Sequence, residues 1–97
     1  MKLRFTPRAV EDICELADYI REKNLAASER VRATIYESLQ TLLLFPKVGR
    51  PQTTQGVRKL VTRKYSYLVY YTFDESNSEI VILGVKHSAR QREHSDL

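Results

Sequence analysis

The chain has 97 residues, of which 42% are hydrophobic and 29% are charged, and its formal net charge is +4. This length suits one compact domain with one hydrophobic core, and the composition excludes an intrinsically disordered chain. No apolar run approaches the roughly 20 residues that span a bilayer. The N-terminus lacks the apolar core of a secretory signal, and a single cysteine, Cys14, excludes an internal disulfide. We therefore expect one domain over residues 1–97 in a reducing cytoplasm.

The first half of the chain predicts a short strand followed by two helices. Residues 3–5 are a short apolar start, and Thr6-Pro7 is a helix-start signal, because Thr is a good N-cap and Pro fits the first helical turn. Apolar residues then recur with helical spacing, which predicts helices over about 7–22 and from about 25 to a stop at Pro46. Because the join between them is short, the helices should pack as an antiparallel hairpin with their apolar stripes in the core.

The second half predicts three consecutive antiparallel strands. Stretches 57–63, 66–73 and 79–87 are rich in β-branched and aromatic residues, and polar turn residues separate them. Alternation assigns one face of the middle strand to Tyr67, Val69, Tyr71 and Phe73, and the other to Leu68, Tyr70 and Thr72. The expected fold class is α+β, with an N-terminal strand and a helical hairpin packed on a three-stranded antiparallel meander. Residues 88–97 are expected to form a flexible polar tail.

Basic residues are concentrated in the middle of the chain. Residues 1–45 carry seven bases and seven acids, whereas residues 46–73 carry six bases and no acid. The six are Lys47, Arg50, Arg58, Lys59, Arg63 and Lys64. Such a patch creates a positive field that attracts nucleic acid or an acidic protein. A solvated sheet edge, protected from edge-to-edge association by Lys and Arg, explains the same pattern, so both interpretations stay open.

The sequence predicts neither a metal site nor a cofactor. Its two histidines and Cys14 lack metal-ligand spacing, and its three glycines do not form a phosphate-binding loop. The remaining chemically capable groups follow the rim of the predicted sheet, namely Arg58, Arg63, Tyr65, Tyr67, His87 and Arg90. Such groups suit a metal-free ribonuclease, in which Tyr or His transfers protons and Arg stabilises the phosphate. They equally suit simple binding, and a lone His at a strand end is often structural.

Several short motifs follow one another along the chain. They are Phe5-Thr6-Pro7 with Ala9 and Asp12, Tyr19-Ile20, Ala26-Ala27, Ile35, Leu39, Phe45-Pro46 with Gly49, Gly56-x-Arg58, Tyr67-Leu68-Val69-Tyr70, and the strand Ile80–Val85 ending in His87-x-x-Arg90. In order and spacing they resemble the RelE/ParE superfamily of bacterial toxins from type II toxin–antitoxin modules, over residues 3–92. The resemblance implies a strand, a helical hairpin and an antiparallel three-stranded meander.

The branch of the superfamily matters because the branches differ in chemistry. Members that cleave mRNA on the ribosome carry a cluster of Lys and Arg on the sheet and a Tyr or His near the C-terminus. In this chain Tyr67 stands where RelE-like members have Arg, Leu60 takes the second basic position of the preceding strand, and Ser88 takes the C-terminal Arg position. Stabilisation of the phosphate charge usually contributes most to such catalysis, so these departures favour the ParE branch. Its members act on DNA gyrase and stall it on cleaved DNA.

The resemblance to ParE implies a toxin that binds macromolecules and is not itself an enzyme. DNA gyrase is the expected target, contacted by Arg58, Arg63, His87, Arg90 and Arg92. A cognate acidic antitoxin is expected to cover the hairpin and the half-apolar sheet face, contacting Leu16, Ile20, Leu39, Leu42, Tyr67, Val69 and Tyr71. Operator DNA would be reached only through the antitoxin, and neither a membrane nor a small-molecule substrate is expected.

Two alternatives to a gyrase-directed toxin stay open. One is a RelE-like, ribosome-dependent mRNA endoribonuclease, with Arg58, Tyr67, His87 and Arg90 as its catalytic residues. The other is a degenerate, non-toxic member that retains only antitoxin binding.

Overall fold

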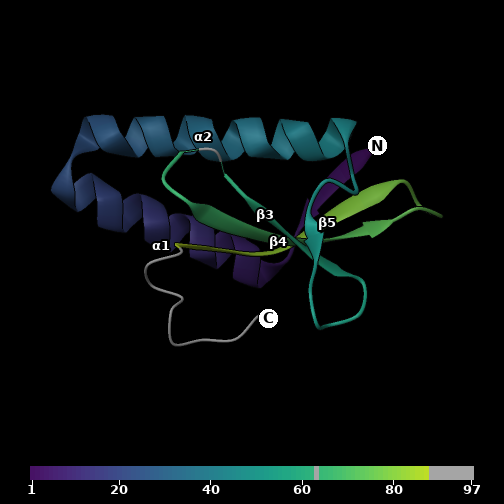
Figure 1. Cartoon of the computed structure of the whole chain (residues 1–97). Coiled ribbons are helices and arrows are strands. Elements are labelled where there is room, and N and C mark those ends of the chain that lie inside the picture. The colour runs from purple at the N-terminus through teal and green to yellow at the C-terminus, as the bar shows by residue number, and fades with distance from the viewer. Residues whose placement is uncertain (63, 88–97) are drawn as a thin grey trace.

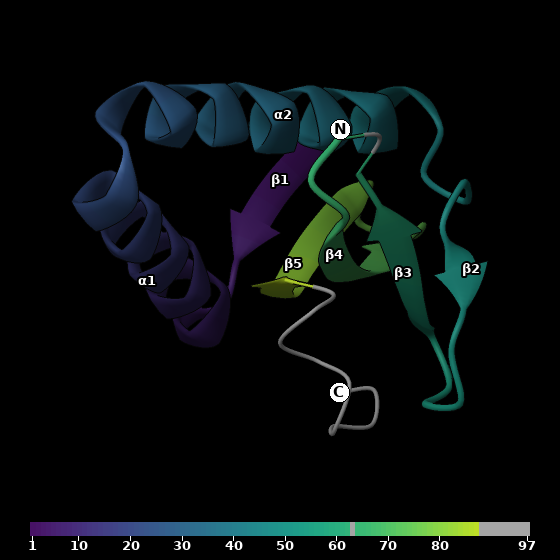
Figure 2. The same cartoon turned by 60° about the vertical axis from the view of Figure 1, so that its left-hand side comes forward.

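The computed structural model describes residues 1–62 and 64–87, and it has two helices and five strands in this part of the chain. The helices are α1 (Pro7–Lys23) and α2 (Leu25–Leu44). The strands are β1 (Lys2–Phe5), β2 (Arg50–Pro51), β3 (Val57–Val61), β4 (Tyr67–Asp74) and β5 (Glu79–His87). The strands form one sheet in the order β1-β5-β4-β3-β2, and the helices pack on one face of it (Figures 1 and 2). Neither helix combines the length and the apolarity needed to cross a membrane.

The sheet is mixed, which corrects the predicted three-stranded antiparallel meander. Strands β3, β4 and β5 form that meander, but β1 joins its edge in parallel, with Lys2 opposite Glu79. A fifth strand, β2, pairs Arg50 with Lys59 in a stretch for which no strand was predicted. Two residues ending in a proline carry no strand periodicity, so this short edge strand had no detectable signal.

The helices begin where the sequence predicts. Thr6 Oγ1 accepts a hydrogen bond from Ala9 N at 3.1 Å and donates one to Leu83 O at 3.2 Å, so the cap of α1 also joins the helix to β5. A single residue, Asn24, ends α1 and caps α2, with its Oδ1 3.1 Å from Ala27 N. From this corner the two helices diverge, as Figure 2 shows.

The main core lies between the helices and the sheet. Its buried residues are Ala9, Leu16, Val31, Ile35, Leu39, Leu42, Tyr67, Val69, Tyr71, Ile80, Ile82 and Val85. A second cluster, with Val57, Leu68 and Tyr70 buried and Leu83 packed against them, uses the other set of alternating positions. The predicted division of β4 into two half-apolar faces is therefore confirmed.

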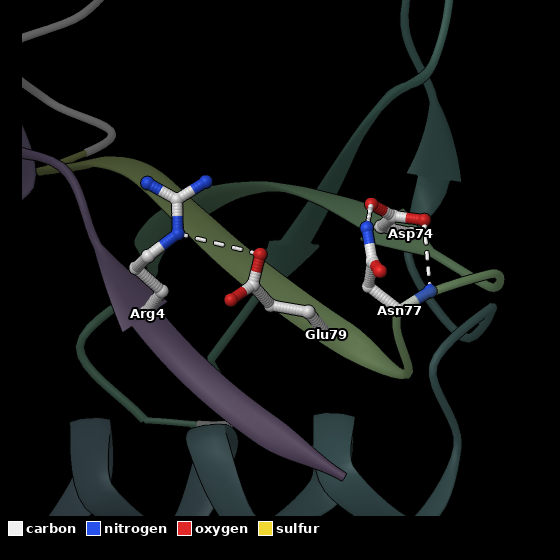
Figure 3. A network of polar contacts seen from close by, with 4 residues as sticks. All are labelled: Arg4, Asp74, Asn77 and Glu79. Atoms are coloured by element: carbon white, nitrogen blue, oxygen red, sulfur yellow. Dashed lines mark hydrogen bonds and ion pairs between the residues drawn. The ribbon is translucent and has the colours of Figure 1, made fainter.

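Polar side chains fix the edge strand β1 and the turn between β4 and β5 (Figure 3). Arg4 Nε lies 3.3 Å from Glu79 Oε1, which links β1 to β5. In the turn, Asp74 accepts hydrogen bonds from Asn77 and Ser76, and these bonds lower the pKa of its carboxyl group. Exposed ion pairs contribute at most about 1 kcal/mol, so these contacts mainly fix local conformation.

Candidate functional site

A β-bulge in β5 decides which side chains meet at one end of the sheet. The pairing with β4 shifts between Tyr70 and Tyr71, and Leu83 is the extra residue. Because side chains alternate along a strand, an extra residue reverses the facing of every later position. The bulge thereby turns His87 toward the helix side, where it lies directly opposite Tyr67.

Three rings gather at this end of the sheet, and we call Tyr65, Tyr67 and His87 the aromatic cluster. The Tyr67 and His87 rings meet edge to face, with centroids 5.0 Å apart and an interplanar angle of 79°. The Tyr65 ring centroid lies 6.4 Å from that of Tyr67. Burial, and to a lesser extent the neighbouring Tyr65, raises the pKa of Tyr67 above its ordinary value. The Tyr67 phenol is therefore neutral at physiological pH and is not a ready general base.

The connection between β3 and β4 holds two successive non-glycine residues in the left-handed region. Their φ values are 65° for Tyr65 and 50° for Ser66, a conformation that costs roughly 1–2 kcal/mol per residue. Thr62, only 4% exposed, supports the turn. Its hydroxyl donates to Lys64 O at 2.5 Å and accepts from Tyr67 N at 3.0 Å. Strained conformations of this kind concentrate at functional sites, which makes the turn part of the candidate site.

Replacing Ser66 with glycine should raise the melting temperature. Glycine adopts a positive φ at little cost, so the variant should gain about 1 kcal/mol, or about 4–8 °C for a domain of this size. Thermal denaturation followed by circular dichroism measures the change. Thr62→Val is the comparison variant that should destabilise the same turn. It leaves the buried Tyr67 N–H without an acceptor, which should cost about 1–3 kcal/mol of stability. A lower melting temperature for Ser66→Gly would contradict the assignment of strain.

Arg58 does not reach the aromatic cluster. It pairs with Tyr71, four positions along β4 from Tyr67, and at about 3.4 Å per residue this places its backbone about 14 Å away. Its guanidinium is engaged elsewhere, since Nη1 donates to Lys47 O at 3.0 Å and to Gly49 O at 2.7 Å. The structure thus gives Arg58 a structural role in holding the segment between α2 and β2.

Tyr71, on β4, contacts the same segment. Its hydroxyl donates to Pro46 O at 2.8 Å and accepts from Gly49 N at 2.8 Å. Burial raises the pKa of the Tyr71 phenol, while the Gly49 N–H and the Arg58 charge act in the opposite direction. The phenol therefore stays protonated at neutral pH and can both donate and accept. We call the contacts of Arg58 and Tyr71 with the backbone of residues 46–49 the loop clamp.

An apolar groove with a volume of about 440 Å³ lies between the diverging helices. It is lined by Phe5, Ile13, Leu16, Ala17, Ile20, Ser28, Glu29, Val31, Arg32, Ala33, Ile35, Tyr36 and Leu39. Of the seven predicted antitoxin contacts, Leu16, Ile20 and Leu39 line this groove. The others, Leu42, Tyr67, Val69 and Tyr71, are core residues with little or no exposed surface. The sequence identified apolar faces but not what covers them, and the role of all seven in antitoxin binding stays a prediction.

The predicted target contacts are only partly described. Arg63, Arg90 and Arg92 lie outside the described residues, as does the predicted tail over 88–97. Within residues 1–62 and 64–87, no group of three His, Cys, Asp or Glu side chains is arranged to hold a metal ion.

The sequence did not predict the loop clamp or the role of Thr62. The available signal was Gly49, three residues after Pro46, because a glycine permits another group to approach the backbone closely.

Comparisons with known proteins identify relatives in sequence and in fold. The protein named "Putative toxin Y4kP" from Sinorhizobium fredii (strain NBRC 101917 / NGR234) is 30% identical over 90 residues, which cover 93% of this chain and 91% of the relative. Among solved structures, the chromosomal ParDE system from P. aeruginosa has a TM-score of 0.75 and 23% identity, covering 90% of this chain and 95% of the other.

RelE-type structures are also similar. The RelBE complex of E. coli has a TM-score of 0.63 and 17% identity, covering 88% of this chain and 93% of the other, which supports the fold alone. The RelBE2 complex of Mycobacterium tuberculosis has a TM-score of 0.64 and 26% identity, covering 89% of this chain and 88% of the other. The family model described as "ParE toxin of type II toxin-antitoxin system, parDE" matches residues 3–92. Because that match spans nearly the whole chain, this protein belongs to the ParE toxin family.

Proposed function

We propose that this protein is a growth-inhibiting toxin that binds and poisons DNA gyrase in the cytoplasm and does not cleave RNA. The supporting observation is the separation of Arg58 from the aromatic cluster. Of the four residues that a ribonuclease site would use, Tyr67 and His87 meet, whereas Arg58 lies about 14 Å away along the sheet, at about 3.4 Å per residue. Arg90 lies outside the described residues.

The engagement of Arg58 strengthens this argument. A catalytic guanidinium must be directed at the developing charge on the phosphate, whereas this one donates to two backbone carbonyls of the loop clamp. The Tyr67 ring, in turn, is buried in the core, with a raised pKa. The geometry therefore supports a binding protein better than a phosphodiesterase.

We also propose that a cognate acidic antitoxin neutralises the toxin by placing an amphipathic helix in the groove between α1 and α2. The groove is mostly apolar, and Tyr36 at its wall is 63% exposed. An amphipathic helix buries its apolar face in such a groove. One of its acidic residues would meet Arg32 at the groove wall, in exchange for the exposed 3.7 Å pair that Arg32 forms with Glu29. This burial of apolar surface would supply most of the binding free energy.

Purified toxin added to gyrase provides the test. We expect inhibition of supercoiling and accumulation of cleaved DNA, while ribosome-bound mRNA in a translating extract stays intact. Codon-specific mRNA cuts with normal supercoiling would instead assign the protein to the RelE-like ribonucleases. Induced expression without any effect on growth would identify a degenerate, non-toxic member.

A further inference from the structure

We propose that the segment from the end of α2 to the start of β2, residues 44–50, docks the toxin onto its protein target. This surface is separate from the groove between the helices. The inference rests on the proposed toxin function and names the surface that the function would use.

The segment exposes three apolar side chains. Leu44 is 73% exposed, Phe45 is 61% exposed and Val48 is 50% exposed. Val48 N donates to Phe45 O at 3.0 Å, which closes a turn and brings the two backbones within about 7 Å. Neighbouring apolar side chains with this degree of exposure are typical of protein-binding sites.

The loop clamp holds these side chains in place. Tyr71 binds Pro46 O and Gly49 N, and Arg58 binds Lys47 O and Gly49 O. Four backbone groups of one short loop are therefore fixed by two side chains of the sheet. A turn alone does not require so many contacts. Fixing a loop before it binds reduces the conformational entropy lost on binding, and this favours a recognition role.

The charges beside the loop indicate the chemistry of the partner. Arg50 and Lys59 lie directly opposite each other in the β2–β3 pair, and like charges in this arrangement are destabilising. Neither forms an ion pair with a carboxylate in the part of the chain that the structure describes. An acidic partner would relieve this repulsion. Lys59 pairs with Tyr70, so it and Arg50 leave the sheet on the face away from the loop clamp, and Lys47 within the loop already pairs with Glu75 at 2.9 Å. Arg50 is nevertheless only two residues from Val48 and lies on the edge strand, so a partner that covers the exposed apolar side chains and this edge would meet both Arg50 and Lys59. This arrangement fits a protein surface that has an apolar pocket with carboxylates at its rim, and it suits a nucleic acid less well.

The test compares the double variant Phe45→Ala, Val48→Ala with the wild-type full chain and with Val10→Ala, which truncates a residue of similar exposure on α1. Growth inhibition, gyrase inhibition and binding of the cognate antitoxin are measured for each. We expect the double variant to need at least a tenfold higher concentration to inhibit gyrase and to lose growth inhibition. Its antitoxin affinity and melting temperature should match those of the wild type, as should all properties of Val10→Ala.

The outcomes separate this inference from the function on which it rests. A wild-type protein without any effect on growth would overturn both. A toxic wild type with an equally toxic double variant would overturn only the docking surface, as would a parallel loss of antitoxin binding. A third variant, Arg50→Glu with Lys59→Glu, distinguishes nucleic acid. An acidic protein target would be repelled by this variant, so we expect it to lose growth inhibition together with the apolar double variant. If it alone loses growth inhibition, and the wild type but not this variant retards labelled DNA in a gel-shift assay, the surface binds nucleic acid and the protein-docking inference is wrong.

Discussion

Replacing Gly49 with alanine is expected to lower the melting temperature of this protein by more than 10 °C. A Cβ atom at this position would lie 2.6 Å from Tyr71 Oη, 2.7 Å from Cε1 and 3.0 Å from Cζ. The Tyr71 ring cannot move aside easily, because it is fully buried in the main core. Overpacking costs about 1–3 kcal/mol, and displacing the phenol from two hydrogen bonds adds about 1 kcal/mol for each. For a domain of this size, each kcal/mol lowers the melting temperature by about 4–8 °C.

Gly56→Ala is the matched control for this substitution. Gly56 has a φ of 82°, and a Cβ atom there would meet no atom within 4 Å. This variant therefore suffers backbone strain of about 1 kcal/mol without any collision. In thermal denaturation, the melting temperature of Gly56→Ala should be well above that of Gly49→Ala. Equal melting temperatures for the two variants would show that the contact with Tyr71 is not the reason for glycine at position 49.

The second large effect is expected in the groove between α1 and α2. Ala33 lines this groove and is exposed, so Ala33→Glu should leave the fold stable. Its carboxylate would lie on the groove wall one helical turn from that of Glu29, and the added negative charge would repel an acidic antitoxin. We expect the dissociation constant for the cognate antitoxin to rise at least about 100-fold, which corresponds to about 2.7 kcal/mol. In cells, co-expressed antitoxin should no longer rescue growth.

Gln40→Glu adds the same charge elsewhere on α2 and is the control for Ala33→Glu. Gln40 is exposed and does not line the groove. Its variant should bind antitoxin with an affinity within about threefold of the wild type, because exposed charges interact weakly. Calorimetric titration measures both affinities. If Ala33→Glu also binds normally, the antitoxin does not occupy the groove.

The helices and the long strands could be predicted because their signals are local. Thr6 and Pro7 mark the start of α1, and alternation along β4 assigned Tyr67 and Tyr71 to one face, as the structure confirms. Two features of the sheet had no local signal. The parallel addition of β1 depends on pairing with a strand far along the chain, and β2 is too short to show any periodicity.

The candidate site could be predicted only in part. The sequence indicated that Tyr67, His87 and Arg58 are capable of binding or catalysis, but not which of them meet. The extra residue Leu83 turns His87 toward Tyr67, and a bulge of one residue is not visible in a pattern of apolar positions. Arg58 was predicted as a target contact, and this role stays a prediction. In the structure its guanidinium forms two contacts of the loop clamp.

By itself, the sequence determined the family, the two helices and the meander, because caps, periodicity and motif spacing act over a few residues at a time. Only the tertiary structure decided that Arg58 and Tyr71 belong to the loop clamp, apart from the aromatic cluster at the other end of β4. The physical reason is register. One bulge and one antiparallel pairing determine which side chains share a face, and both depend on contacts between residues far apart in the chain.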